Sequence, residues 1–199
     1  ALALAGTVWA QRTVSVVVAG NQMSDTGTAA IVLASQGDEN ALGFSVTFNP
    51  AVLRFDSHTP GSGENGQTMS INLNDSQKTT GKVGFAISLP TNVPFSAGSK
   101  QLVVLNFTVL APAASETIGF GDIPILREVS NVTANELTAV TYNSLTIATN
   151  MVPPAAPVIT THPVSQTKNV GEGATFTVVA TGSPAPTFQW RKGTTTLVN

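Results

Sequence analysis

Oxygen-bearing side chains gather at two predicted turns of the sequence, where they could contribute to a cation site. Calcium takes carboxylate and amide oxygens from loops, so each cluster offers part of such a site. Neither cluster has the Asp-x-Asp-x-Asp-Gly spacing of a calcium loop, and polar residues favour turns in any case. Ordinary turn chemistry is the preferred interpretation, with calcium as the alternative and no other cofactor expected. The two clusters are Asp38, Glu39 and Asn40, and Asn72, Asn74 and Asp75.

Residue types that perform catalysis are few and scattered. The two histidines, His58 and His162, fall in different halves of the chain, so neither a Ser-His-Asp arrangement nor a histidine metal site can be argued. The chain has no cysteine, which excludes disulfides, thiolate zinc sites and cysteine nucleophiles. The carboxylates form no pair suited to glycoside hydrolysis. We therefore expect a protein that is not an enzyme.

Carbohydrate binding usually depends on a row of exposed aromatic rings. Most aromatic residues here are phenylalanines at positions that alternate inward along predicted strands. Trp190 is expected in a core, which leaves Trp9 and Tyr142 as the plausible platform residues. A lone ring is weak evidence, so a carbohydrate ligand is an alternative and not the leading expectation.

The elements that must position these residues are β-strands, because the hydrophobic pattern repeats every second residue. Leu42, Phe44, Val46 and Phe48 share one face of a strand that Asn49-Pro50 ends. About nine such strands, each with one apolar face, predict an all-β fold: a two-sheet sandwich or jelly roll. A short helical turn near 134–137 is also expected. Strands are predicted at 13–18, 28–34, 42–48, 52–55, 68–74, 83–89, 101–110, 116–120 and 141–148.

Composition places the chain among extracellular all-β proteins. Of its 199 residues 42% are hydrophobic and only 10% are charged, with 17 Gly and 12 Pro. With a net charge of −2, the chain has no excess of basic residues to attract nucleic acid or an anionic membrane. No run of about 18 apolar residues exists, so we expect no membrane span. The predicted location is secreted or on a bacterial cell surface.

Four segments are expected from the changes in composition along the chain. Residues 149–157 are rich in proline and form a stiff linker between a domain at 13–148 and further β-structure at 158–199. Residues 1–12 precede the first strand. Their small apolar residues ending in Val8-Trp9-Ala10 resemble the tail of a secretory signal. The alternative is a donor strand of the mature chain that inserts Leu2, Leu4 and Val8 into another sheet.

Residues 13–148 resemble a cohesin module, a nine-stranded jelly-roll sandwich related to some carbohydrate-binding modules. Three stretches carry the resemblance: Gly43 to Leu53, with its Asn-Pro break; Gly81 to Ala86; and Gln101 to Val109. The resemblance implies binding of a dockerin module through one exposed sheet face, or a role as a spacer or sugar-binding module. The family's contact residues form no local motif, so none can be assigned here.

Residues 158–199 are similar to the first part of a bacterial immunoglobulin-like domain. The resemblance rests on Ile159, His162-Pro163, the run 170–173, the alternating pair Phe176 and Val178, Gly182-x-Pro184-x-Pro186, and the run 188–193. It implies that Trp190 is the strand-C tryptophan of that fold. An immunoglobulin sandwich needs about seven strands in about 100 residues, so this segment is incomplete. Its apolar side would form an acceptor groove for β-structure from elsewhere, lined by Phe176, Val178, Phe188 and Trp190.

Two functions follow as expectations. The first is a non-catalytic extracellular structural or adhesive protein, part of a larger surface protein or fibre that assembles by β-strand addition. Its partner would be a second copy or further domains of the same chain. The alternative is a recognition module for a dockerin-like protein or a carbohydrate.

Overall fold

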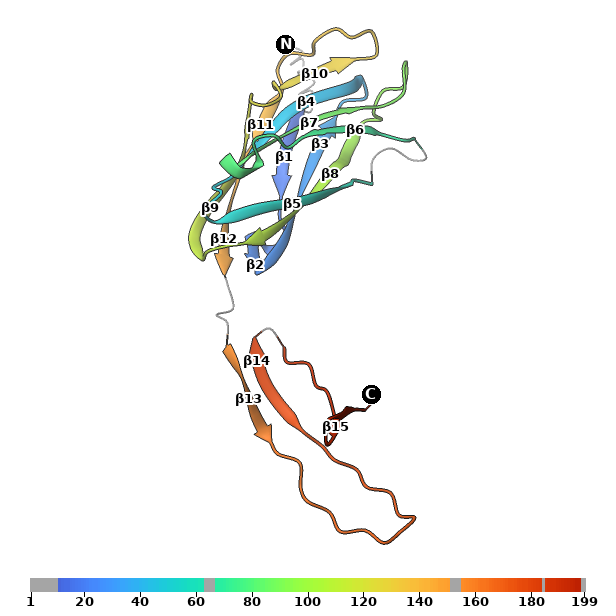
Figure 1. Cartoon of the computed structure of the whole chain (residues 1–199). Helices are drawn as coiled ribbons and strands as arrows, with labels where there is room; N and C mark the ends of the chain where they lie inside the picture. The colour runs from blue at the N-terminus through green and yellow to red at the C-terminus, as the bar shows by residue number, and fades with distance from the viewer. Residues whose placement is uncertain (1–10, 63–66, 151–154, 184, 198–199) are drawn as a thin grey trace, which may run out of the picture. The chain divides into compact units, whose positions relative to one another are not determined.

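The computed structural model describes residues 11–62, 67–150, 155–183 and 185–197. The chain divides into two compact units, Ala1–Met151 and Val152–Asn199 (Figure 1). Both units are built from strands, and the described helical elements are two short 3-10 turns, Ala19–Asn21 and Lys78–Thr80. The fold is therefore all-β, as the period-two alternation predicts.

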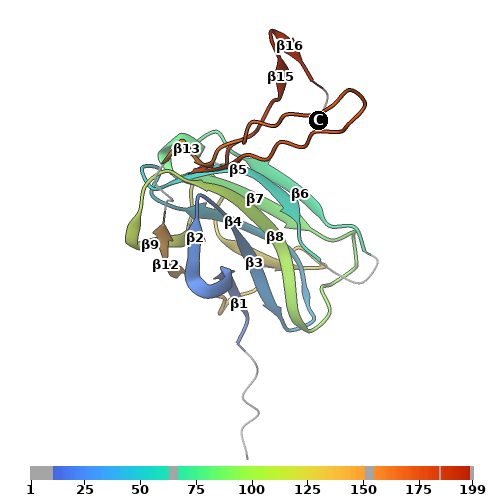
Figure 2. The same cartoon turned by 90° about the horizontal axis from the view of Figure 1, so that it is seen from below.

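The first unit has two curled layers that one strand connects. In the first layer the long strands β3 and β8 lie side by side (Figure 2). β3 also pairs with β1, β5 pairs with β8, and β1 pairs in parallel with β11. The short strand β2 joins β3 to β12. The bounds are β1 Thr13–Val17, β2 Gln22–Ser24, β3 Thr26–Ser35, β5 Leu53–Pro60, β8 Gly98–Val109, β11 Thr141–Asn143 and β12 Leu145–Asn150.

The second layer is centred on β4, which pairs with β7 along its length and with β10 at its beginning. β6 pairs with the other side of β7. β9 pairs with β12 through its first part and with β4 through its last residues, so it passes from one layer to the other. The bounds are β4 Glu39–Thr47, β6 Ser70–Asn74, β7 Lys82–Ser88, β9 Ala113–Gly121 and β10 Glu128–Asn131.

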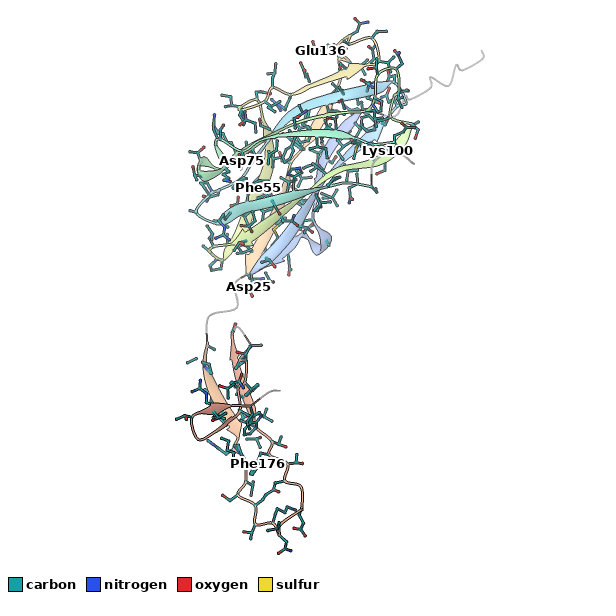
Figure 3. All side chains as sticks on the ribbon, turned by 45° about the vertical axis from the view of Figure 1, so that its right-hand side comes forward. Asp25, Phe55, Asp75, Lys100, Glu136 and Phe176 are labelled. Carbon is teal, nitrogen blue, oxygen red and sulfur yellow. The ribbon has the colours of Figure 1, made fainter. Side chains whose placement is uncertain are left out.

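The core lies between the layers and contains the side chains that alternate inward. Phe44, Phe85 and Phe107 are fully buried, and Phe55 meets Phe85 and Phe107 edge to face with ring centroids 6.5 and 6.0 Å apart. Aromatic pairs of this geometry stabilise a core beyond their buried area. In Figure 3 the labelled Phe55 lies among the packed side chains of the first unit.

The predicted strands of the first unit are confirmed, with three differences. The segment 141–148 is two strands, β11 and β12, and the short strands β2 and β10 were not expected. The predicted helical turn at 134–137 is wrong. Ala134 has a φ of 58°, and Glu136 forms an isolated bridge with Ser130, so this segment is an irregular β-turn region.

The second unit contains a two-stranded ribbon and a small hairpin. β13, Ala155–Thr161, pairs with β14, Val179–Ser183, and β15, Arg191–Lys192, pairs with β16, Thr195–Thr196. Residues 162–178 and 185–190 belong to no strand. In the described part of this unit no residue is buried. Across the described ranges of the chain, no helix is long and apolar enough to cross a membrane.

Candidate functional site

The outer face of the β4–β7–β6 sheet carries only small or short polar side chains over its middle. Because inward residues alternate with outward ones, the register places three outward rows across the strands. The first row is Ala41, Ser88 and Ser70; the second is Gly43, Ala86 and Asn72; the third is Ser45, Gly84 and Asn74. Another polypeptide could approach such a surface closely, because no large side chain stands in its way.

A loop of the same chain, residues 122–127, already lies on part of this face. The Ser45 hydroxyl donates a hydrogen bond to the Ile125 carbonyl at 2.7 Å and accepts one from the Ile125 N–H at 2.8 Å. A Cβ atom on Gly43 would stand 2.7 Å from the carbonyl oxygen of Leu126, and one on Gly84 would stand 2.7 Å from the side chain of Ile125. The two glycines therefore permit the close approach of the loop.

An ion pair closes the loop at its base. The Arg127 guanidinium donates from Nε and an Nη to the two oxygens of Asp122 at 2.8 and 2.9 Å, and the Arg127 N–H also donates to Asp122. These hydrogen bonds hold the pKa of Asp122 below its usual range and raise the pKa of Arg127. The guanidinium also lies 5.3 Å from the ring centre of Tyr142, a cation–π distance. The loop is thus held at both its tip and its base.

The closed loop exposes two large apolar side chains, Ile123 at 55% and Leu126 at 61%. They are two of the four exposed large hydrophobic residues in the described part of the first unit. Beside the loop runs a groove of about 150 Å³ floored by Ala86 and Gly43. Among the described residues that line it, Glu128 is the only charged one. We define the recognition face as this groove, the loop 122–127 and the small-residue positions that are not buried under the loop: Ala41, Ser70, Asn72, Asn74, Ala86 and Ser88.

The first polar cluster, for which calcium was the alternative interpretation, binds an arginine of the same chain. Arg12 donates to Glu39 at 2.5 Å and to Asp38 at 2.7 Å. Glu39 is fully buried and also accepts hydrogen bonds from the Ser35 hydroxyl and the Gln36 N–H. Burial alone would raise the pKa of Glu39, but these hydrogen bonds outweigh it and hold the pKa below its usual value. Asn40, the third member, uses its amide to donate to the carbonyl of Val93 at 2.7 Å.

The second predicted calcium cluster does not converge on one point. Asp75 pairs with Lys78 at 2.7 Å, and Asn74 accepts from the backbone N–H and hydroxyl of Ser76. Asn72 lies on the outer row of β6. Within the described ranges, no three His, Cys, Asp or Glu side chains come together as a metal site.

Tyr142, one of the two candidate rings for carbohydrate binding, is not fully open to solvent. Tyr142 is half-buried, with Arg127 over its face and the ring of Phe120 at 5.3 Å. Trp9, the other platform candidate, lies outside the described residues. His58 packs edge-on against Phe85 at 5.6 Å, and His162 belongs to the second unit.

The predicted acceptor residues lie together in the second unit. Val178, Phe188 and Trp190 line an open groove of about 210 Å³ with Ile159 and Pro163, and Phe176 contacts Trp190 with ring centres 6.4 Å apart. Phe176 and Phe188 are 47% and 44% exposed. The donor candidates Leu2, Leu4 and Val8 lie outside the described residues.

Titration of Tyr142 tests the enclosure of its ring, because it is the chain's single tyrosine. Burial raises its pKa to about 12, a rise that the Arg127 charge opposes. An ultraviolet pH titration of the native chain should show one midpoint near that value, whereas the chain in denaturant should titrate near 10. The group contributes stability below pH 10 and loses that contribution as the pH rises toward 12. A native midpoint near 10 would mean that the ring is open to solvent.

No protein-family model and no curated protein matches the sequence, but many solved structures share the fold of the first unit. A cohesin module from a Clostridium perfringens family 33 glycoside hydrolase is 11% identical, with a TM-score of 0.58 over 71% of this chain and 98% of that one. The sixth cohesin of Acetivibrio cellulolyticus scaffoldin B, solved in complex with a dockerin, is 14% identical, with a TM-score of 0.56 over 72% and 100%. A non-cellulosomal cohesin from the archaeon Archaeoglobus fulgidus is 12% identical, with a TM-score of 0.54 over 71% and 92%.

The first unit therefore has a cohesin-like fold, which confirms the resemblance drawn from the sequence. The loop 122–127 and the strand β10 that follows it were missed by sequence reasoning. The outward glycines Gly43 and Gly84, in adjacent rows of two neighbouring strands, were the available indication that another backbone lies on this face.

Proposed function

We propose that the first unit is a non-catalytic recognition module that binds a dockerin-like protein through the recognition face. The observation that carries the proposal is the contrast on this face between small side chains and the two exposed apolar residues Ile123 and Leu126. Support also comes from the fold, since a module of similar fold was solved with a dockerin bound. A secreted or cell-surface location in a bacterium belongs to the same proposal.

The proposed mode of binding follows from the shape of the face. A partner helix would lie over the short side chains of β7 and β6, so that its backbone comes close to the sheet. Its apolar stripe would then cover Ile123 and Leu126, and burying the exposed part of each stabilises a complex by about 1–2 kcal/mol. Glu128, at the rim of the groove, suits a basic residue on the partner. A carbohydrate is less well supported, because the ring of Tyr142 is covered.

Calorimetric titration of the whole chain with a panel of purified dockerin modules tests this proposal. Ala86→Arg, in the middle of the recognition face, should weaken any binding at least about a hundredfold, because it places a large charged side chain between the partners. Thr28→Arg, an exposed position on the other layer, is the matched control and should leave binding unchanged. Equal loss in both variants would contradict the assignment of the face, and absence of binding throughout the panel would contradict the dockerin-like partner.

A second candidate function is favoured by a separate observation, the exposed apolar groove of the second unit. It is a structural or adhesive role in a larger surface protein or fibre, with assembly by β-strand addition at this groove. Phe176, Val178, Phe188 and Trp190 would then be covered by a strand from elsewhere. The two roles are compatible, since each uses a different unit.

A further inference from the structure

The second unit presents one apolar side built from two segments. Ile159 on β13 and Ala180 on β14 are register partners, and Val178 lies two residues before Ala180 on the same side. Phe188 and Trp190 of the following segment line the same groove, and the Trp190 carbonyl is fixed by a hydrogen bond from the Leu197 N–H at 2.9 Å. The groove residues carry no charge, so an apolar occupant would leave no ionised group buried without a partner.

The ribbon also offers free strand edges. β13 pairs with β14 and, in the part of the chain that the structure describes, neither pairs with any other strand. A two-stranded ribbon is marginally stable alone in water, and an added strand satisfies its unpaired N–H and C=O groups. The site therefore suits an extended segment that brings both main-chain partners and apolar side chains.

Residues 1–10 have the chemistry that this site requires. The segment contains no ionisable side chain, and Leu2, Leu4 and Val8 fall on one side of an extended strand. Ten extended residues span about 33 Å, more than the roughly 23 Å of the seven-residue β13. The segment is therefore long enough to pair with the part of β13 that follows Pro157, a residue without an N–H to donate.

Arg12, which follows this segment in the sequence, and Asn150, which precedes the linker, lie at opposite ends of the first unit. Arg12 is fixed at one end of β3, because Thr13 pairs with Ala34, whereas Asn150 lies at the other end, beside Ser24. The ten residues of β3 span about 33 Å. The attachment points of the N-terminal segment and of the linker on the first unit are therefore about 33 Å apart.

We propose that residues 1–10 of one copy add as a strand to the β13–β14 ribbon of a second copy, with Leu2, Leu4 and Val8 in the groove beside Trp190. The inference rests on the proposed assembly role of the second unit. Because the donor and acceptor surfaces differ, the contact is heterologous and repeats from copy to copy. The expected product is a linear polymer.

Sedimentation velocity of the full chain over a range of concentrations provides the test. The chain should form a ladder of oligomers, and deletion of residues 1–10 should leave monomers. Val178→Lys should also give monomers, because it places a charge in the groove. Val170→Lys is the matched control, since Val170 is fully exposed away from the groove, and it should polymerise like the parent.

A peptide experiment identifies the donor directly. The deletion variant retains Trp190 as its single tryptophan, so its emission should shift to the blue when a peptide of residues 1–10 carrying Trp9→Phe binds. Replacing Leu2 or Leu4 of the peptide by lysine should weaken binding about tenfold or more. If the deletion variant still polymerises while Val178→Lys does not, the donor is wrong but assembly at the groove stands. If the parent chain is monomeric at every concentration and the peptide does not bind, both the donor segment and assembly at the groove are wrong.

Discussion

Arg12→Ala is expected to lower the melting temperature of the first unit by roughly 10–15 °C, the largest effect of any single side-chain truncation proposed for this chain. The guanidinium is 6% exposed and is the cationic partner of the fully buried carboxylate of Glu39. Its removal leaves that carboxylate buried without a counter-charge, which costs about 3–5 kcal/mol. Thermal unfolding followed by circular dichroism measures the effect.

The loss of stability caused by Arg12→Ala should depend on pH. The pKa of Glu39 in the folded chain lies below its ordinary value of 4.5, so ionised Glu39 contributes stability above that pH. This contribution is lost as the pH falls through the folded pKa. The difference in stability between the parent and Arg12→Ala should therefore narrow in acid.

A surface ion pair provides the control for Arg12→Ala. Lys78 and Asp75 also approach to 2.7 Å, but both side chains are more than 40% exposed. Lys78→Ala should leave the melting temperature almost unchanged, because solvent screens such pairs. If Arg12→Ala and Lys78→Ala lose equal stability, the Arg12–Glu39 ion pair does not make the large contribution to stability assigned to it.

Gly43→Val is expected to displace the loop 122–127 and to destabilise the first unit by about 1–3 kcal/mol, since overpacking at a close contact forces the backbone to move. The nearest obstacle is the carbonyl oxygen of Leu126, a main-chain atom that cannot rotate away. The loop should lose its hydrogen bonds to Ser45 as it moves. Hydrogen exchange at the Ile125 N–H should therefore become much faster, and affinity for a partner at the recognition face should fall with it.

Gly173→Val is the matched control, because an added Cβ there meets nothing within 4 Å. It should change stability by less than about 0.5 kcal/mol and leave exchange in the loop untouched. If the hydrogen-exchange rate of the Ile125 N–H is unchanged in Gly43→Val, the loop 122–127 does not contact Gly43 as described.

The strands of the first unit could be predicted from the sequence because alternation is a local property. Leu42, Phe44 and Val46 share a face wherever the strand lies, since the side-chain period is two. The partner of Glu39 could not be predicted in the same way. Arg12 meets it only because β1 pairs with β3, a contact that no short stretch of sequence encodes.

In the second unit, the alternation of apolar and polar residues does not by itself predict which segments form strands. Residues 166–170 and most of 174–178 have strand-like composition yet form no ladder in the described structure. A strand is defined by its partner, and alternation does not supply one. Val178, Phe188 and Trp190 line one groove, whereas their role as an acceptor and the identity of what covers them stay predictions.

The chain enters and leaves the first unit at opposite ends, since Arg12 lies at one end of β3 and Asn150 at the other. β1 is hydrogen-bonded on both sides, to β3 and to β11. Tension applied through the flanking segments would therefore pull β1 along its own axis and strain both ladders simultaneously, instead of peeling them apart bond by bond. We therefore expect β1 to be loaded in shear under such tension, with the β1–β3 and β1–β11 hydrogen bonds sharing the load.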